Sequence, residues 1–165
     1  MASRHGSTNE IAHAIAVVLE TLDIDVDVHA PADIDSVSGY DAVIIGSAVY
    51  AGHWLSSAVE VIARHRDELN RRPVFLFSSG PLGDPPRPAD ATPEATRCES
   101  DTGAMDHRIF PGSLLRRQLG LIEQVDSRAH GLPDGDFRPW DDIVDWAGAI
   151  GRYLRAESTA AVPTP

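Results

Sequence analysis

Two short apolar runs, each followed by a loop of small residues, limit this chain to few architectures. The runs cover residues 42–45 and 74–77. Apolar runs of this length without alternation are typical of parallel strands that are covered on both faces. Between them, four apolar residues recur at helical spacing: Leu55, Ala58, Val59 and Ile62. Strands that alternate with helices predict an α/β protein whose parallel sheet carries helices on both faces.

The N-terminal stretch, residues 2–11, is a run of small and polar residues that leads into a helix. Ser7 and Glu10 have the spacing of a capping box. The helix is predicted from four apolar residues at helical spacing: Ile11, Ile15, Leu19 and Leu22. A small-residue loop at a helix N-terminus supplies N–H donors, hydroxyls and the positive end of the helix dipole, which are the parts of a phosphate site. These residues leave two alternatives open, a capped surface helix without a ligand and an anion site.

Three further segments have recognisable patterns. Ile24, Val26 and Val28 alternate with aspartates, which predicts a strand with one solvated face near a sheet edge. Residues 107–110 are another strand candidate. Residues 139–154 predict a helix, with a proline near its first turn.

The remaining segments are less regular. Residues 84–97 are rich in proline, so we predict an exposed excursion rather than a linker between domains. Residues 113–129 are ambiguous and would give one short helix through Leu114, Leu115, Leu119 and Ile122. We therefore predict one domain over residues 1–156 and a disordered tail over residues 157–165.

Composition excludes several classes of protein. The formal net charge of −11 argues against a nucleic-acid binder or a protein held on anionic lipid. Cys98 is the only cysteine, so there is no disulfide framework and no thiolate metal site. No segment has the pattern of a signal peptide, and no apolar run approaches the roughly 18 residues of a membrane span. We expect a cytoplasmic protein without a metal, with small molecules or basic proteins as partners.

Three small-residue loops would meet at one edge of the predicted sheet. They are residues 3–8, 47–54 and 78–83. In parallel sheets, ligands bind outside the carboxyl ends of the strands. The alternative is that glycine and serine are simply common in loops. We favour a ligand site, because all three loops fall at the same edge.

These loops resemble those of a known family. The segments Ser3–Thr8, Val43–Trp54, Leu76–Gly83 and Asp136–Ile143 resemble the flavodoxin-domain proteins of the actinobacterial type, which are related to the menaquinone-dependent protoporphyrinogen dehydrogenase family. The resemblance covers nearly the whole chain, and its second segment is the most specific. It implies a flavodoxin-like three-layer α/β sandwich, a parallel sheet of order 2-1-3-4-5 and non-covalently bound FMN.

The resemblance also implies roles for individual residues. The FMN phosphate would be held by Ser3, His5, Gly6, Ser7 and Thr8, with Arg4 either adding charge or facing solvent. The isoalloxazine ring would be lined by Ser47, Ala48, Val49, Tyr50, Ala51 and Gly52, and Tyr50 is the candidate to stack on it. The other side of the ring would be flanked by Ser79, Gly80, Pro81, Leu82 and Gly83. Trp54 is expected to pack at the helix start. His53 is either a proton donor, since imidazole titrates at about pH 6.5, or a polar residue at the rim.

The N-terminus departs from the family pattern. In this fold a central strand of about five or six residues precedes the phosphate loop, and here only Met1 and Ala2 precede it. Residues 24–28 and 42–45 then lack a partner between them, and each unmade buried hydrogen bond costs about 1–3 kcal/mol. Two hypotheses follow: the natural protein carries a strand upstream of Met1, or the chain is a truncated form that folds poorly or lacks FMN. We favour the first, and expect weak FMN binding by the chain as given.

Several functions remain open. The first is an FMN-dependent oxidoreductase that acts on protoporphyrinogen or a quinone, with the flavin carrying the chemistry. The second is a flavodoxin-type electron shuttle whose acidic surface docks basic carriers. The third is a non-catalytic flavodoxin-like domain that has lost FMN. A phosphorelay receiver would need an aspartate where Ile45 leads into Gly46, and a serine hydrolase would need a G-x-S-x-G turn that these loops do not supply.

Overall fold

A central parallel sheet organises the molecule. The computed structural model describes residues 1–2, 6–80, 90–115 and 134–160. Within these residues, four strands form a sheet of order β2-β1-β3-β4, namely β1 (Val43–Tyr50), β2 (His53–Trp54), β3 (Val74–Ser79) and β4 (Asp106–Phe110). Strands β1, β3 and β4 are parallel, as predicted for an α/β protein. A separate antiparallel pair joins β5 (Ser113–Leu114) to β6 (Gly135–Asp136).

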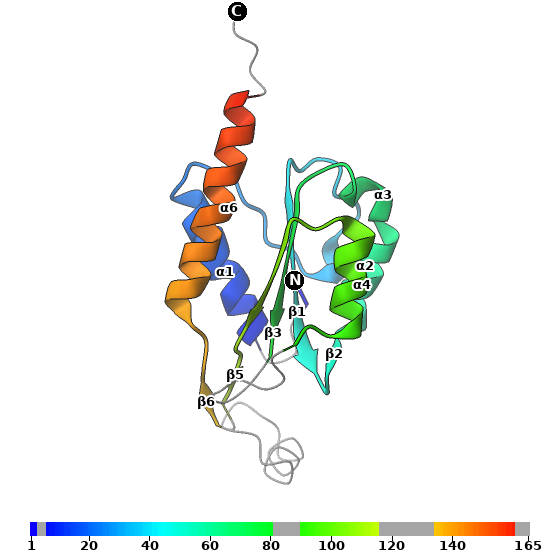
Figure 1. Ribbon diagram of the computed structural model, residues 1–165, viewed down its shortest axis with the longest axis vertical. Coiled ribbons are helices and arrows are strands. Elements are labelled where there is room, and N and C mark those ends of the chain that lie inside the picture. The colour runs from blue at the N-terminus through cyan, green and yellow to red at the C-terminus, as the bar shows by residue number, and fades with distance from the viewer. Residues whose placement is uncertain (3–5, 81–89, 116–133, 161–165) are drawn as a thin grey trace, which may run out of the picture.

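Helices cover both faces of the sheet (Figure 1). One face carries α1 (Ser7–Glu20) and α6 (Trp140–Ala160), and the other carries α2 (Ser56–Arg64), α3 (Arg66–Leu69) and α4 (Pro93–Thr102). Successive strand residues point to opposite faces. Phe75 and Phe77 therefore pack with α1 and α6, while Val74 and Leu76 pack in the cluster that contains the α2 and α4 residues. The predicted strand at residues 74–77 is confirmed and continues to Ser79.

Helix α1 begins where the sequence predicts, but without a capping box. Ile11, Ile15 and Leu19 are buried, as expected from their spacing. The N-cap residue is Gly6, with a φ of 88° that glycine adopts without a steric penalty. Ser7 and Glu10 contact residues far along the chain instead of capping each other. The capping-box prediction is wrong because both side chains bond these distant partners. A local sequence pattern cannot reveal such partners.

The segment at residues 24–29 keeps the predicted alternation of burial but forms no strand. Its apolar side chains are half-buried, and the aspartates between them are exposed. The amino group of Met1 donates to the carbonyl of His29 at 2.9 Å. Ala2 forms a single parallel bridge with Ser47 of β1. A single bridge at Ala2 does not make a ladder of hydrogen bonds. Residues 24–28 therefore lack the neighbouring strand that they would need to form a strand themselves.

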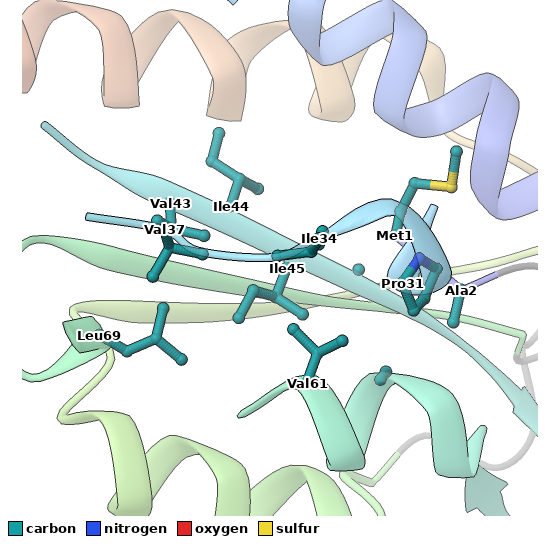
Figure 2. A pocket seen from close by; sticks show the side chains of 12 residues that line it. Met1, Ala2, Pro31, Ile34, Val37, Val43, Ile44, Ile45, Val61 and Leu69 are labelled. Atoms are coloured by element: carbon teal, nitrogen blue, oxygen red, sulfur yellow. The ribbon is translucent and has the colours of Figure 1, made fainter. Parts of the chain in front are cut away.

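An apolar cavity of about 40 Å³ lies beside Met1 and Ala2, between β1 and α2 (Figure 2). Among the residues that line it are Ile34, Val37, Val43, Ile45, Val61 and Leu69. The short 3-10 helix η1 (Pro31–Asp33) also contributes to the cavity wall, because its first residue, Pro31, lines the cavity. Burial lowers the pKa of the Met1 amino group, which lies in these surroundings. The central position of the sheet is thus filled for two residues, and the space beyond them has apolar walls.

The segment at residues 47–54 is a hairpin and not the expected loop. β1 continues to Tyr50, Ala51 and Gly52 form the turn with φ values of 50° and 82°, and β2 returns antiparallel to β1. The small side chains were interpreted as a loop because they lack the bulk that is typical of a strand. Trp54 is buried before α2, as the sequence analysis expected.

Three predictions for the second half of the chain also need correction. Residues 93–102, expected to lie within or beside an exposed excursion, form α4, where the Oγ1 of Thr92 accepts from the amide of Ala95. Thr-Pro-Glu is a helix-start signal that the proline content obscured. Residues 113–114 belong to a strand rather than a helix. α6 extends to Ala160, so the predicted disordered tail is wrong for residues 157–160. Residues 81–89, 116–133 and 161–165 lie outside the described residues.

In the described part of the chain, none of the helices combines the length and the apolar composition that a membrane crossing requires.

Candidate functional site

The site lies at the edge where the carboxyl ends of β1 and β3 meet. Ser47 pairs in register with Ser78. Ala2 bridges Ser47, so the chain enters α1 from this same edge. The Oγ of Ser7 accepts from the amide of Ser113, which follows β4, at 3.2 Å. The start of α1, which follows Gly6, the end of β1 at Tyr50 and the end of β3 before Gly80 therefore lie at one end of the sheet. This is the lower end in Figure 1.

The start of α1 can hold an anion. The N-cap residue Gly6 has no side chain that could cap the helix. The first amides of α1 and the positive end of its dipole point toward the site edge, because α1 begins there. A Cβ at Gly6 would meet no described atom within 4 Å. Thr8 is buried, and it fixes the first turn against the core. This arrangement of backbone donors is suited to a phosphate group.

Arg138 neutralises the carboxylate that lies nearest to this helix start. Its guanidinium bonds Glu10 in the first turn of α1 at 2.5 Å and Asp136 of β6 at 2.6 Å. The side chain is only 6% exposed and lies 4.5 Å over the ring of Trp140. The bonds from Arg138 hold the pKa of Asp136 below its usual range. Arg138 therefore ties the start of α1 to the start of α6 and offsets a negative charge that would repel an anion.

The β1–β2 hairpin presents Tyr50 at the surface, with 43% of the residue exposed. The hairpin is anchored from beneath by buried side chains. The Oγ of Ser47 accepts from the amide of Leu55 at 3.0 Å and donates to the carbonyl of Ala48. The indole N–H of Trp54 donates to the Oγ of Ser78 at 2.8 Å. An exposed aromatic ring on an anchored hairpin is suited to contact a flat ligand.

Gly80 permits β3 to pass close to the hairpin. Its φ is 157°, and a Cβ at this position would lie 2.7 Å from the carbonyl oxygen of Val49. Its amide donates to the carbonyl of Phe110 at 3.3 Å. Gly80 thus joins the ends of β1, β3 and β4, and a side chain there would push the hairpin away.

His53 lies at the rim of the site. Its side chain is 67% exposed, and its Nδ1 is 2.9 Å from Glu94 Oε1 in the first turn of α4. The hydrogen bond with His53 lowers the pKa of Glu94. A role for His53 in proton transfer stays a prediction.

The described residues include most of the predicted site. Those brought to the edge are Gly6, Ser7, Thr8, Ser47, Ala48, Val49, Tyr50, Ala51, Gly52, Ser79 and Gly80. Ser3, Arg4, His5, Pro81, Leu82 and Gly83 lie outside the described residues. Thr8, Ser47 and Ser79 are buried and support the site from within. Sequence reasoning missed Arg138 as a partner of α1, although it lies within one of the segments that carried the resemblance.

Comparison with known families identifies the fold at this point. The model of the flavodoxin domain family matches residues 1–126. The chain belongs to the flavodoxin domain family. This flavodoxin-domain protein is also similar to the protoporphyrinogen IX dehydrogenase (quinone) of Escherichia coli strain K12, with 35% identity over 78 residues. That region is 46% of this chain and 43% of the relative, so the chain matches less than half of the relative's length. The corresponding proteins of strains O6:H1 and O157:H7 match equally.

Solved structures support the same fold. A flavodoxin from the domain Archaea aligns with a TM-score of 0.61 and 14% identity, over 94% of this chain and 99% of that one. The rubredoxin oxygen:oxidoreductase of Desulfovibrio gigas aligns with a TM-score of 0.66 and 14% identity, over 98% of this chain and 36% of that one. The two-electron reduced flavodoxin of Megasphaera elsdenii gives a TM-score of 0.55 and 22% identity, over 66% and 85%. The predicted flavodoxin-like α/β class is confirmed.

Proposed function

We propose that this flavodoxin-domain protein binds FMN non-covalently at the edge formed by α1, β1 and β3, and acts as a redox protein. One observation carries the proposal: the start of α1 at Gly6 and the anchored hairpin with Tyr50 lie at the same end of the sheet. The first fits a phosphate and the second fits a flat ring. Membership of the flavodoxin domain family supports a flavin as the ligand.

The residues of the described edge fit the chemical parts of FMN. Gly6 and the amides at the start of α1 offer neutral donors to the phosphate, while Arg138 compensates the nearby charge of Glu10. The Oδ1 of Asn9, also in the first turn, is buried and has no hydrogen-bond partner among the described residues. This oxygen is an acceptor, so a hydroxyl group of a ligand at this end of the helix, and not its phosphate, would satisfy it.

FMN supplies the redox chemistry when it is bound. The protein's own residues would bind and orient it: the start of α1 would hold the phosphate, Tyr50 would cover one face of the ring, and the backbone near Gly80 would limit the other side. Buried Ser47 and Trp54 keep the hairpin in position. Residues 3–5 and 81–83 complete the proposed set.

For the reaction we propose an oxidoreductase related to protoporphyrinogen and quinone dehydrogenases. The support is the 35% identity to the Escherichia coli protein over 78 residues. An electron-transfer protein that serves basic carriers is the second candidate, and the net charge of −11 favours it. Anaerobic reduction, followed by mixing with a quinone, a porphyrinogen or a basic carrier, distinguishes the two through the rate of reoxidation.

Fluorescence titration with FMN tests the cofactor. This chain is expected to bind FMN weakly, with a Kd above the submicromolar range, because Ala2 is the only described residue that pairs with β1 beside the start of α1. Tyr50→Ala is expected to raise the Kd by about tenfold through loss of the aromatic contact, whereas Tyr50→Phe keeps the ring and binds like the parent. Equal affinity in Tyr50→Ala and the parent would contradict the assignment of Tyr50. No detectable binding at millimolar FMN would contradict the cofactor.

A further inference from the structure

A buried chain of three polar side chains lies beneath the β1–β2 hairpin. The indole N–H of Trp54 donates to the Oγ of Ser78 at 2.8 Å, and this Oγ lies 3.0 Å from the Nε2 of His107. The side chains come from β2, β3 and β4 and are each at most 5% exposed. The rings of Trp54 and His107 also meet edge to face, with centroids 5.9 Å apart.

The hydrogen-bonding capacity of these groups fixes the direction of the chain. An indole N–H is only a donor, so the hydroxyl of Ser78 accepts from Trp54. The proton of that hydroxyl has one acceptor among the described residues, the Nε2 of His107. His107 therefore has an unprotonated Nε2 and carries its proton on Nδ1, which lies 3.7 Å from Glu99 Oε2 on α4.

The surroundings of His107 keep its ring neutral. Burial lowers the pKa of His107, and this effect outweighs the opposite influence of Glu99 on α4 and Asp106 on β4. The groups from β2 and β3, Trp54 and Ser78, carry no charge. A neutral ring is the form that accepts the Ser78 hydroxyl proton, so charge state and geometry agree.

Trp54 transmits this arrangement to the candidate site. It pairs with Val49 across the hairpin, and the neighbouring pair joins Tyr50 to His53. Displacing the indole of Trp54 would therefore displace Val49 and Tyr50, the hairpin residues that are proposed to contact the flavin ring.

We propose that His107 is a positioning residue, which holds the Tyr50 hairpin in place through Ser78 and Trp54. A proton on Nε2 removes the acceptor for the Ser78 hydroxyl and leaves that buried hydroxyl proton without a partner among the described residues. The chain of bonds then rearranges, and the hairpin moves with Trp54. The effect on FMN rests on the function proposed above, whereas the effect on the hairpin does not.

Nuclear magnetic resonance of the indole N–H groups tests the chain of bonds without any ligand. The protein has three tryptophans, and Trp140, under Arg138, serves as an internal reference. On lowering the pH from 8 for as long as the protein stays folded, the Trp54 signal is expected to shift with a midpoint below 6.5, because burial lowers the pKa of His107. His107→Gln keeps an acceptor for Ser78 and is expected to abolish the shift while leaving the signal at pH 8 in place.

Ser78→Ala is the complementary variant. It removes the bond to Trp54, so the Trp54 signal is expected to be displaced at every pH and not to titrate. Circular dichroism at each pH confirms that the variants are folded. A Trp54 signal that titrates alike in His107→Gln and the parent, or one that does not titrate in the folded parent, would overturn the proposal.

FMN titration of the same proteins separates this inference from the proposed function. Ser78→Ala is expected to weaken FMN binding by about three- to tenfold at pH 8, as the loss of one buried hydrogen bond predicts. The parent is expected to bind FMN more weakly as the pH falls through the lowered pKa of His107, whereas His107→Gln is expected to bind like the parent at pH 8 and to lack that weakening. Normal binding by Ser78→Ala would contradict the positioning role and leave the FMN site standing. Titration of Trp54 in a protein that fails to bind FMN would contradict the FMN site alone.

Discussion

The two sides of β1 are built very differently. Toward β3, six residue pairs run in register from Val43 with Val74 to Ala48 with Ser79, and β4 continues the sheet. Toward the N-terminus, one bridge joins Ala2 to Ser47, flanked by two hydrogen bonds. The first side is a continuous ladder, whereas on the second side the described residues pair with β1 only at this bridge and, through β2, at Val49 and Tyr50. One strand therefore has a fully paired edge and an edge that is paired only near its carboxyl end.

Packing follows the same division. Leu76 and Phe77 on the complete side are at most 1% exposed. The apolar side chains at positions 24, 26 and 28 on the sparse side are half-buried, and the cavity beside Met1 lies there. Local opening is expected where backbone pairing and apolar contacts are few. This fold therefore keeps its site edge through β1, β3 and α1, although Ala2 alone among the described residues bridges β1 at the neighbouring strand position.

The largest expected effect comes from emptying the complete side. Leu76→Ala is expected to lower the free energy of unfolding by about 2–5 kcal/mol, because the packed core leaves a cavity. Ile24→Ala on the sparse side is expected to cost about 1 kcal/mol, since the side chain is half-buried. Urea unfolding of both variants measures the difference. Equal losses would show that the two sides are packed alike.

Completing the sparse side is expected to have the next largest effect. Fusing an apolar segment of five residues ahead of Met1 would offer backbone partners to residues 24–28 and 43–46. At about 0.5–1.5 kcal/mol for each hydrogen bond, the gain in unfolding free energy is about 2 kcal/mol or more. Slower hydrogen exchange at Val43–Ile45 is the accompanying sign.

The control for that fusion carries a proline at the middle of the added segment, which removes a donor from the ladder. A gain of equal size from both fusions would contradict a strand in the space beside Met1.

Adding a side chain to β1 opposite β3 is expected to be less costly. A Cβ at Gly46 would lie 2.0 Å from the ring of Phe77, which is fully buried. Gly46→Ala is therefore expected to destabilise the protein by about 1–3 kcal/mol. Gly39→Ala is the matched control, because a Cβ there meets no described atom within 4 Å. Thermal unfolding of the two variants provides the comparison, and equal melting temperatures would show that Phe77 yields without cost.

The smallest expected effect concerns Glu68, which holds a wall of the cavity. Its carboxylate accepts from the hydroxyl of Ser36 and the amide of Val37, and these bonds lower its pKa. Its contribution to stability is therefore complete above pH 4.5, the ordinary value, and is lost as the pH falls through the lowered one. Glu68→Gln is expected to flatten this part of the acid limb in urea titrations between pH 3 and 6. The exposed Glu60→Gln should leave the limb unchanged, and an unaltered limb in Glu68→Gln would contradict this role.

The elements that could be predicted from the sequence are those fixed by local pattern. The apolar run at residues 74–77 became a buried strand, whereas the run at residues 42–45 lies in β1 from Val43 onward and is buried only at Ile45. Ile11 and Ile143 face the core as their spacing indicates. The alternation at residues 24–28 predicted burial correctly and pairing wrongly. Burial depends on the side chains of the segment itself. Pairing depends on the backbone of a neighbouring strand, and at that position the described residues supply only the bridge at Ala2.

The candidate site shows the same limit. Small residues after apolar runs predict which loops meet at an edge, because topology alone brings them together. The bonds that hold the site do not follow from topology. Arg138 meets Glu10 across 128 positions, and His107 meets Ser78 across 29. Such pairs leave no periodic or local signal, so the structure was needed to find them.

The packing of α1 against α6 has a consequence for how the protein is made. One helix follows the N-terminus and the other is the last element described, yet they share a core with Phe75 and Phe77. On the ribosome, α1 emerges well before α6 and waits while the residues between them are translated. Throughout that interval the face of the nascent sheet that both helices cover lacks the part of its cover that α6 supplies, and exposed apolar surface of this kind promotes aggregation and chaperone binding. The core around Phe75 and Phe77 therefore closes only after α6 has left the ribosome.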